Sequence, residues 1–115
     1  MIHLALHAIV PLGLALAIYR SRATRAFLVM IATMAVDVDH LLADPIYDPQ
    51  RCSIGFHPLH TAPAIVLYLL LALAPLALGA RRGAGLTERP RWDGVHLAGV
   101  GLLVHMLLDQ IDCWT

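Results

Sequence analysis

The chain has 115 residues, of which 59% are hydrophobic and only 14% are charged. Soluble domains contain roughly 45–50% apolar residues, so this composition excludes an ordinary soluble domain and favours a membrane protein. Eight Arg and no Lys balance eight acidic residues, which leaves no net positive charge to attract nucleic acid.

Four apolar segments are long enough to cross a bilayer as helices. They cover residues 2–19, 26–43, 61–79 and 94–111, and a span needs about 20 apolar residues at about 1.5 Å each. Asp-Pro and Pro-Leu-His sequences between the second and third segments are typical of an ordered loop, which we place at residues 44–60. We therefore predict an all-α fold, an integral membrane four-helix bundle that forms a single domain over residues 1–115.

Arginine is concentrated in the linkers that follow the first and third segments. The arginines of these linkers are Arg20, Arg22, Arg25, Arg81, Arg82, Arg89 and Arg91. Short arginine-rich loops stay in the cytoplasm, so both termini and the 44–60 loop are predicted on the extracytoplasmic side. Residues Ala15 to Ala17 mimic a signal-peptide cleavage site. No basic residue precedes the apolar run, however, so we expect the first segment to remain as a span.

Ionisable side chains recur within the apolar segments, where each costs a few kcal/mol and therefore indicates a functional site. They form three pairs at helical spacing: His3 and His7, Asp37 and His40, and His105 and Asp109. Residues three or four apart share one face of a helix. Two more histidines, His57 and His60, lie where the loop meets the third segment, and Pro58 is expected in the first turn of that helix.

The predicted topology places these groups at a common depth. Asp37 precedes Asp44 by seven residues, and His105 precedes Asp112 by seven, so each lies about 10 Å below the outer end of its helix. His7 lies at a similar depth on the first helix. We therefore expect imidazoles and carboxylates from separate helices to converge in the outer half of the bilayer.

A divalent metal ion would organise such a group, because it binds neutral imidazoles and carboxylates together. Zinc is the expected cofactor, as one or two ions, and another divalent metal could use the same ligands. The candidate ligands are His3, His7, Asp37, His40, His57, His60, His105 and Asp109. Asp39 lies about 200° from Asp37 around an ideal helix, which favours contacts to ligands rather than to the metal. A metal-free polar network and haem ligation by two histidines are the alternatives.

Three further residues lie outside this group. His96 falls in the inner half of its segment and is expected to serve in packing or at the interface. Cys52 and Cys113 are both predicted on the outer side, where disulfides can form. A disulfide, a free buried pair and metal thiolates all remain open for these two cysteines.

Three segments resemble motifs of known membrane proteins: A-V-D-V-D-H-L-L, R-C-S-I-G-F-H-P-L-H and H-M-L-L-D-Q-I-D-C. Over nearly the whole chain they resemble an uncharacterised family of small four-span bacterial membrane proteins. That family is itself similar to the inner-membrane metal-dependent hydrolases typified by the LexA-regulated member. The resemblance implies site roles for Asp37, Asp39, His40, His57, His60, His105 and Asp109, and more loosely for His3 and His7. The H-P-L-H segment is shorter than the His-rich loop of the larger hydrolases.

We therefore expect a zinc-dependent hydrolase of the bacterial inner membrane, with its site facing the periplasm or exterior. Asp39 or His40 would handle the proton. A lipid or lipid-linked phosphoester is the expected substrate class, because the site would lie just beneath the outer headgroups. The alternative is a non-catalytic protein that binds a metal or handles ions or protons. Membrane lipids are the expected partners, nucleic acid is not expected, and the oligomeric state is left open.

Overall fold

The computed structural model of the chain describes residues 2–81, 83, 85 and 89–114. The α-helices among these residues are α1 (Ile2–Ala17), α2 (Ala23–Ala32), α3 (Ala62–Arg81) and α4 (Pro90–Trp114). The 3-10 helices are η1 (Arg20–Arg22), η2 (Thr33–Leu42) and η3 (Pro58–His60). No strand occurs in the described part of the chain, so the prediction of an all-α protein is confirmed there.

The helices follow the four predicted segments with shifted boundaries. The predicted segment 26–43 is α2 continued by η2, so its second half is a 3-10 helix. Pro58 belongs to the separate turn η3, because Thr61 has extended backbone angles and interrupts the helix before α3 begins. The last helix starts at Pro90 rather than residue 94. Proline suits this first helical position, since the N–H that it lacks would have no partner in the helix.

Length and composition allow two to three of these helices to cross a membrane, where four spans were predicted. Ala62–Gly79 and Pro90–Trp114 qualify individually. The segments Ile2–Ala17 and Arg20–Leu42 qualify only as a pair, bent by 111° at the break between them. The helix α1 does not qualify alone because it is too short. Its 16 residues extend about 24 Å, whereas a hydrocarbon core is about 30 Å thick.

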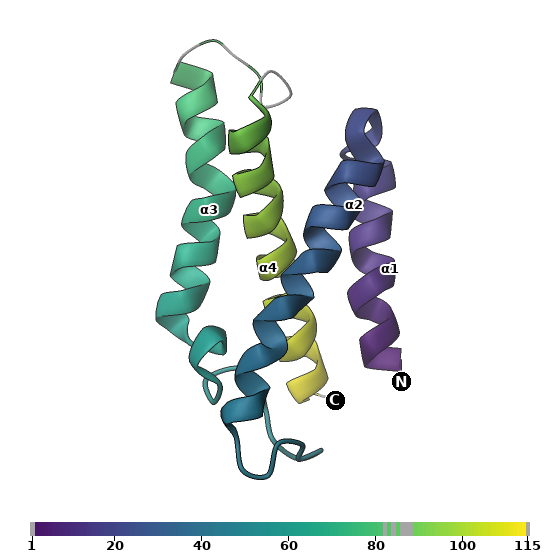
Figure 1. Cartoon of the computed structure of the whole chain (residues 1–115), viewed down its shortest axis with the longest axis vertical. Helices are drawn as coiled ribbons and strands as arrows, with labels where there is room; N and C mark the ends of the chain where they lie inside the picture. The colour runs from purple at the N-terminus through teal and green to yellow at the C-terminus, as the bar shows by residue number, and fades with distance from the viewer. Residues whose placement is uncertain (1, 82, 84, 86–88, 115) are drawn as a thin grey trace.

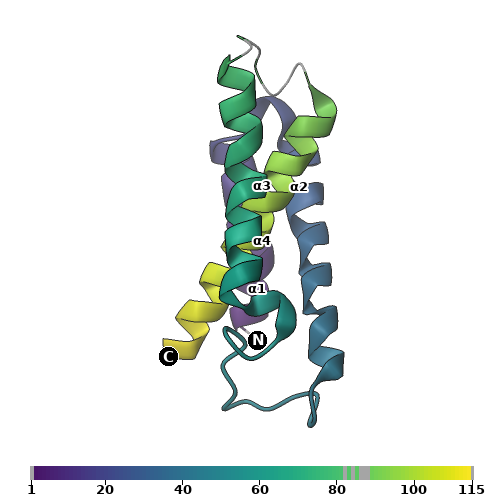
Figure 2. The same ribbon diagram turned by 90° about the vertical axis from the view of Figure 1, so that its left-hand side faces the viewer.

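The central helix of the bundle is α4, which packs along α3 and also contacts α1, α2 and η2 (Figure 1). Both ends of the chain lie at the end of the bundle that carries the loop of residues 43–57 (Figure 1). We call this the loop end. The opposite end, which carries the α1–α2 and α3–α4 connections, is the linker end. Figure 2 shows that the loop crosses the loop end between η2 and the start of α3.

A disulfide fastens the loop to the last helix. It joins Cys52, in the loop, to Cys113, near the end of α4. The two residues are 61 positions apart in sequence, so the bond closes a large ring of chain and restricts the unfolded state. The loop is therefore held against the end of the helix that carries His105 and Asp109.

The interior of the bundle contains polar as well as apolar side chains, and many large apolar side chains face outward. The buried polar residues are His7, Asp39, His57, His60, Asp93, His96, His105 and Asp109. Leu12, Val66 and Leu73 are among the exposed apolar residues. Soluble monomers rarely expose large apolar patches, whereas a bilayer would cover the outer faces of such helices.

A buried polar cluster connects the helices at the linker end. Arg22 donates hydrogen bonds from Nε and Nη2 to the carboxylate of Asp93, at 2.9 and 2.8 Å. The Tyr19 hydroxyl donates to Nε2 of His96 at 2.8 Å, and Nδ1 of His96 donates to the carbonyl of Ala72 at 2.7 Å. His96 therefore serves in packing, because its ring joins α3 and α4 to Tyr19, two residues after the end of α1.

Two glycines allow α4 to approach its neighbours closely. A Cβ atom at Gly99 would lie 2.7 Å from the carbonyl carbon of Leu71 and 2.8 Å from Cα of Ala72, both in α3. A Cβ atom at Gly101 would lie 2.9 Å from Cα of Met30 in α2. Small residues at helix crossings permit this close backbone packing in membrane proteins.

We expect Gly99→Ala to lower the free energy of unfolding by about 1–3 kcal/mol, because the added methyl group would force α3 and α4 apart. Thermal unfolding in detergent measures this as a lower Tm. Gly13→Ala is the matched control, since a Cβ at Gly13 meets no atom of the described residues within 4 Å. Equal Tm values for Gly99→Ala and Gly13→Ala would contradict the close approach of the two helices.

Candidate metal centre

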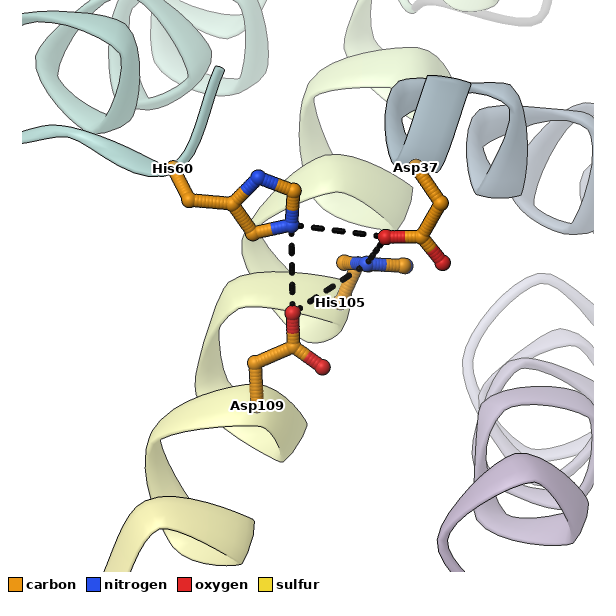
Figure 3. A group of neighbouring side chains, drawn as sticks. All are labelled: Asp37, His60, His105 and Asp109. Carbon is orange, nitrogen blue, oxygen red and sulfur yellow. Dashed lines mark hydrogen bonds and ion pairs between the residues drawn. The ribbon is translucent and has the colours of Figure 1, made fainter. Parts of the chain in front are cut away.

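Four side chains from three elements meet at the loop end, and Figure 3 shows them pointing toward one another. Asp37 comes from η2, His60 from the end of η3, and His105 and Asp109 from successive turns of α4. Each offers one ligand atom, and the four atoms all lie within 4.8 Å of one another. We call Asp37, His60, His105 and Asp109 the central cluster.

Nitrogen and oxygen atoms alternate around the central cluster. Asp37 Oδ1 lies 3.0 Å from His105 Nε2 and 3.4 Å from His60 Nε2. On the other side, Asp109 Oδ2 lies 3.2 Å from His60 Nε2 and 3.4 Å from His105 Nε2 (Figure 3). Tetrahedral zinc with bonds of about 2.0–2.1 Å separates its ligand atoms by about 3.3 Å. The four neighbouring nitrogen–oxygen distances of the central cluster are therefore close to those of a zinc ligand set.

Unpaired nitrogen atoms support this interpretation. His60 is fully buried, and its Nε2 makes no hydrogen bond to any residue that the structure describes. Its polar neighbours are carboxylate oxygens of Asp37 and Asp109, at 3.4 and 3.2 Å, so a deprotonated Nε2 would face two anions at an electrostatic cost. A cation placed between the carboxylates and imidazoles would remove that cost, because it would accept the nitrogen lone pair.

Asp39 orients His60 from the opposite side of the imidazole. Its Oδ2 accepts hydrogen bonds from His60 Nδ1 at 3.1 Å and from the Leu59 backbone N–H at 2.8 Å. When His60 is deprotonated, as a metal ligand must be, these contacts keep the remaining proton on Nδ1 and leave the Nε2 lone pair facing Asp37 and Asp109. A carboxylate behind a histidine ligand is a recurrent arrangement in metal sites. Asp39 therefore contacts a candidate ligand, in line with its predicted position away from the metal.

The 3-10 geometry of η2 allows Asp37 and Asp39 to reach the same imidazole. Residues two apart are separated by about 120° around a 3-10 helix, compared with about 160° around an α-helix. Asp37 consequently faces Nε2 of His60 while Asp39 binds its Nδ1. A 3-10 helix of ten residues is long, since such runs rarely exceed three or four residues.

His3 and His7 form a second group with Asp109. Their Nε2 atoms lie 3.0 and 3.3 Å from Asp109 Oδ1, the oxygen that is not part of the central cluster. The His7 and His105 rings touch, with centroids 4.4 Å apart. Both histidines of α1 therefore lie directly beside the central cluster.

His40 and His57 form a third group with Asp39. The two rings lie against each other with centroids 3.8 Å apart. His40 Nδ1 donates to Asp39 Oδ1 at 3.2 Å, and its Nε2 lies 3.1 Å from the hydroxyl of Ser53. Sequence reasoning missed Ser53, because a lone loop serine carries no signal. The eight predicted ligands thus all lie at one end of the bundle, divided among three adjoining groups.

The neighbouring charges favour opposite protonation states for the two loop histidines. Burial lowers the pKa of His60, but the carboxylates of Asp109, Asp37 and Asp39 together raise it to about 10. Burial and the adjacent His40 ring lower the pKa of His57. A proton and a metal ion therefore compete for His60, because a metal ligand must be deprotonated, whereas His57 is neutral at physiological pH.

A cavity of about 210 Å³ lies beside the central cluster, between the loop and the helix ends. Its lining includes Asp37, His40 and Asp109 together with Arg51 of the loop. Arg51 donates a hydrogen bond to the carbonyl of Pro45 at 2.8 Å, and its guanidinium lies 4.5 Å from the ring centroid of Phe56. The cavity thus brings the candidate ligands and one cation to a common space.

The model of the family of unknown function DUF6122 matches residues 1–79. The chain belongs to this family. The matched part contains His3, His7, Asp37 and His60, and it ends before α4. No curated protein and no solved structure matches the chain. Because the description of the family states no function, membership by itself assigns neither a membrane location nor an activity.

From the geometry of the central cluster we expect zinc binding to depend on its four side chains. We expect His105→Ala and Asp109→Asn to lower zinc affinity at least about 100-fold, because each removes a ligand and leaves the remaining groups poorly compensated. Metal analysis of the purified protein and competition with a chelating dye measure this.

Two control variants remove the same residue types elsewhere. His96→Gln removes a buried histidine at the linker end, and Asp44→Asn removes an exposed loop carboxylate that belongs to none of the described groups. Both should retain zinc. Equal zinc loss in the controls, or zinc retention in His105→Ala and Asp109→Asn, would argue against the site.

Proposed function

We propose that the protein is a membrane-embedded zinc-dependent hydrolase with its site at the loop end. The central cluster carries this proposal, since two imidazoles and two carboxylates from separate elements have the spacing of zinc ligands. The orienting contact from Asp39 to His60 adds support, because metal sites commonly hold their histidines in this way.

A zinc ion that keeps an open coordination position at the loop end would lower the pKa of a bound water toward neutrality and polarise a phosphoryl or carbonyl oxygen. His40 is placed to accept the proton of that water. It lines the cavity, its Nδ1 donates to Asp39, and its Nε2 is directed toward the Ser53 hydroxyl. Asp39 is 3% exposed and contacts His40, His60 and Leu59, so we assign it a positioning role.

We further propose that all four helical segments cross the membrane as a single domain over residues 1–115, with the loop end outside. The α1 and α2–η2 segments would add to the two helices that qualify individually. Arg20, Arg22, Arg25 and Arg89 belong to the linker end, as expected of cytoplasmic loops. Arg82 lies outside the described residues. The Cys52–Cys113 disulfide at the loop end favours an oxidising compartment such as the periplasm.

This topology predicts the behaviour of reporter fusions in bacteria. Alkaline phosphatase fused after residue 114 should be active, since it requires export, and green fluorescent protein fused after residue 85 should fluoresce in the cytoplasm. The reciprocal pair of fusions serves as the control. An active phosphatase at both positions would contradict the single span, α4, that separates residue 85 from residue 114.

We propose a lipid or lipid-linked phosphoester as the substrate class. With the loop end outside, the cavity would open near the outer headgroups, where phosphate esters are abundant. The apolar outer faces of the helices would place the surrounding lipid at the same level. The cavity volume of about 210 Å³ suits a headgroup phosphate rather than a whole lipid.

The hydrolase proposal predicts zinc-dependent turnover of phosphoesters. Purified protein in lipid nanodiscs should hydrolyse bis(p-nitrophenyl) phosphate, and His40→Ala should lower kcat about 100-fold or more, because positioned acid–base groups contribute about 10²–10⁴-fold. The His40→Ala protein should keep its zinc. Retained kcat in this variant would exclude His40 as the proton acceptor, and zinc binding without turnover of any phosphoester or carboxyl ester would exclude the hydrolase.

A non-catalytic metal-binding protein is the second candidate, and one observation favours it. The central cluster offers four protein ligands, which complete a tetrahedron as structural zinc sites do, whereas catalytic zinc sites keep one position open. Loss of zinc would then lower the Tm of the protein, and no substrate would be turned over.

A further inference from the structure

We propose that His3, His7 and Asp109 bind a second divalent ion, and that Asp109 bridges it to the ion of the central cluster. This inference rests on the metal centre proposed above and deepens it, because the second ion would be the one that meets the substrate.

The carboxylate of Asp109 has the same surroundings on both of its oxygens. Oδ2 lies 3.2 and 3.4 Å from the Nε2 atoms of His60 and His105. Oδ1 lies 3.0 and 3.3 Å from the Nε2 atoms of His3 and His7. Each oxygen is therefore at zinc-ligand spacing from two imidazoles. A carboxylate placed in this way can bind one ion through each oxygen, as in two-metal sites with ions about 3.5–4 Å apart.

His7 is held in the orientation of a metal ligand. Its Nδ1 donates a hydrogen bond to the backbone carbonyl of His3 at 2.9 Å, so the lone pair is on Nε2. The side chain is 4% exposed, and Nε2 makes no hydrogen bond within the described part of the chain. That lone pair faces the anionic Asp109 oxygen at 3.3 Å, a repulsive contact that a cation between the two atoms would convert into attraction.

His3 completes the ligand set from one turn earlier in α1. Its Nε2 is directed at the same Asp109 oxygen as that of His7, and its Nδ1 lies 3.7 Å from an oxygen of Asp112. The four-residue spacing on a helix places both imidazoles on one face. At 3.7 Å the Asp112 contact is too long for a hydrogen bond, so this carboxylate acts on His3 through its charge.

The second site has an open position, whereas the central cluster does not. Three protein ligands would leave the fourth tetrahedral position free, which is the pattern of catalytic zinc. His3 and Asp109 also line two cavities, of about 210 and 220 Å³, and Arg51 lines both. A substrate in either cavity would therefore lie beside the second ion.

The net charge of the residues that line the cavity of about 210 Å³ also favours two ions. Four carboxylates, of Asp37, Asp48, Asp109 and Asp112, and the single guanidinium of Arg51 line the cavity of about 210 Å³. With neutral histidines these described residues carry a formal charge of −3. One divalent ion would leave the cavity anionic, and two would make it cationic, which an anionic phosphoester requires for favourable binding.

Cobalt titration of the full chain in lipid nanodiscs tests the proposal, because Co²⁺ accepts the same nitrogen and oxygen ligands and is visible by EPR. The wild type should bind two equivalents. The second equivalent should reduce the EPR intensity per cobalt and produce an integer-spin signal, since carboxylate-bridged ions are magnetically coupled. This measurement needs no variant and is therefore independent of any folding defect.

Three variants then assign the sites. His3→Ala and His7→Ala should each bind one equivalent without coupling, and His96→Gln should bind two coupled equivalents. One equivalent in the wild type, two equivalents without coupling, or two coupled equivalents in His7→Ala would overturn the proposal. Phosphoester turnover with a single ion would refute only the second site, and a coupled pair without turnover would refute only the hydrolase.

Discussion

The carboxylate of Asp109 is the group around which the loop end is built. It is 6% exposed, and imidazoles from α1, η3 and α4 approach it from two sides. Removing a carboxylate from water costs several kcal/mol unless other charges replace its hydration. The surrounding histidines supply part of that replacement, and the proposed cation would supply the rest. The positions of three helical elements are therefore tied to one buried charge at the loop end.

Close helix packing makes this convergence possible. Gly99 and Gly101 bring α4 close to the backbones of α3 and α2, and the ion pair of half-buried Arg22 with buried Asp93 joins the helices at the opposite end. With both ends constrained, α4 can carry His96 toward the linker end and Asp109 toward the loop end without exposing either. The apolar outer surface contributes little to this specificity, because lipid solvates apolar side chains about as well as neighbouring helices do.

The helical pattern of the sequence predicted which residues gather at the site better than it predicted which of them contact one another. The spacing of Asp37 and His105 from the ends of their helices predicted a common depth, and the two side chains are in direct contact at 3.0 Å. The pattern could not divide the ligands into groups, because spacing along a helix is silent on how far each helix is rotated toward its neighbours. It also missed the 3-10 geometry of η2, since no residue type distinguishes a 3-10 from an α-helical turn here.

The sequence by itself determined that the protein is all-α and which face of each helix carries imidazoles and carboxylates. Composition and the fixed rise and twist of a helix are sufficient for both. Only the tertiary structure decided that Asp109 presents one oxygen to each pair of histidines, that Asp39 lies behind His60, and that Cys52 is bonded to Cys113. These outcomes depend on the relative rotation and separation of helices, which are set by long-range packing at residues such as Gly99 and have no local sequence pattern.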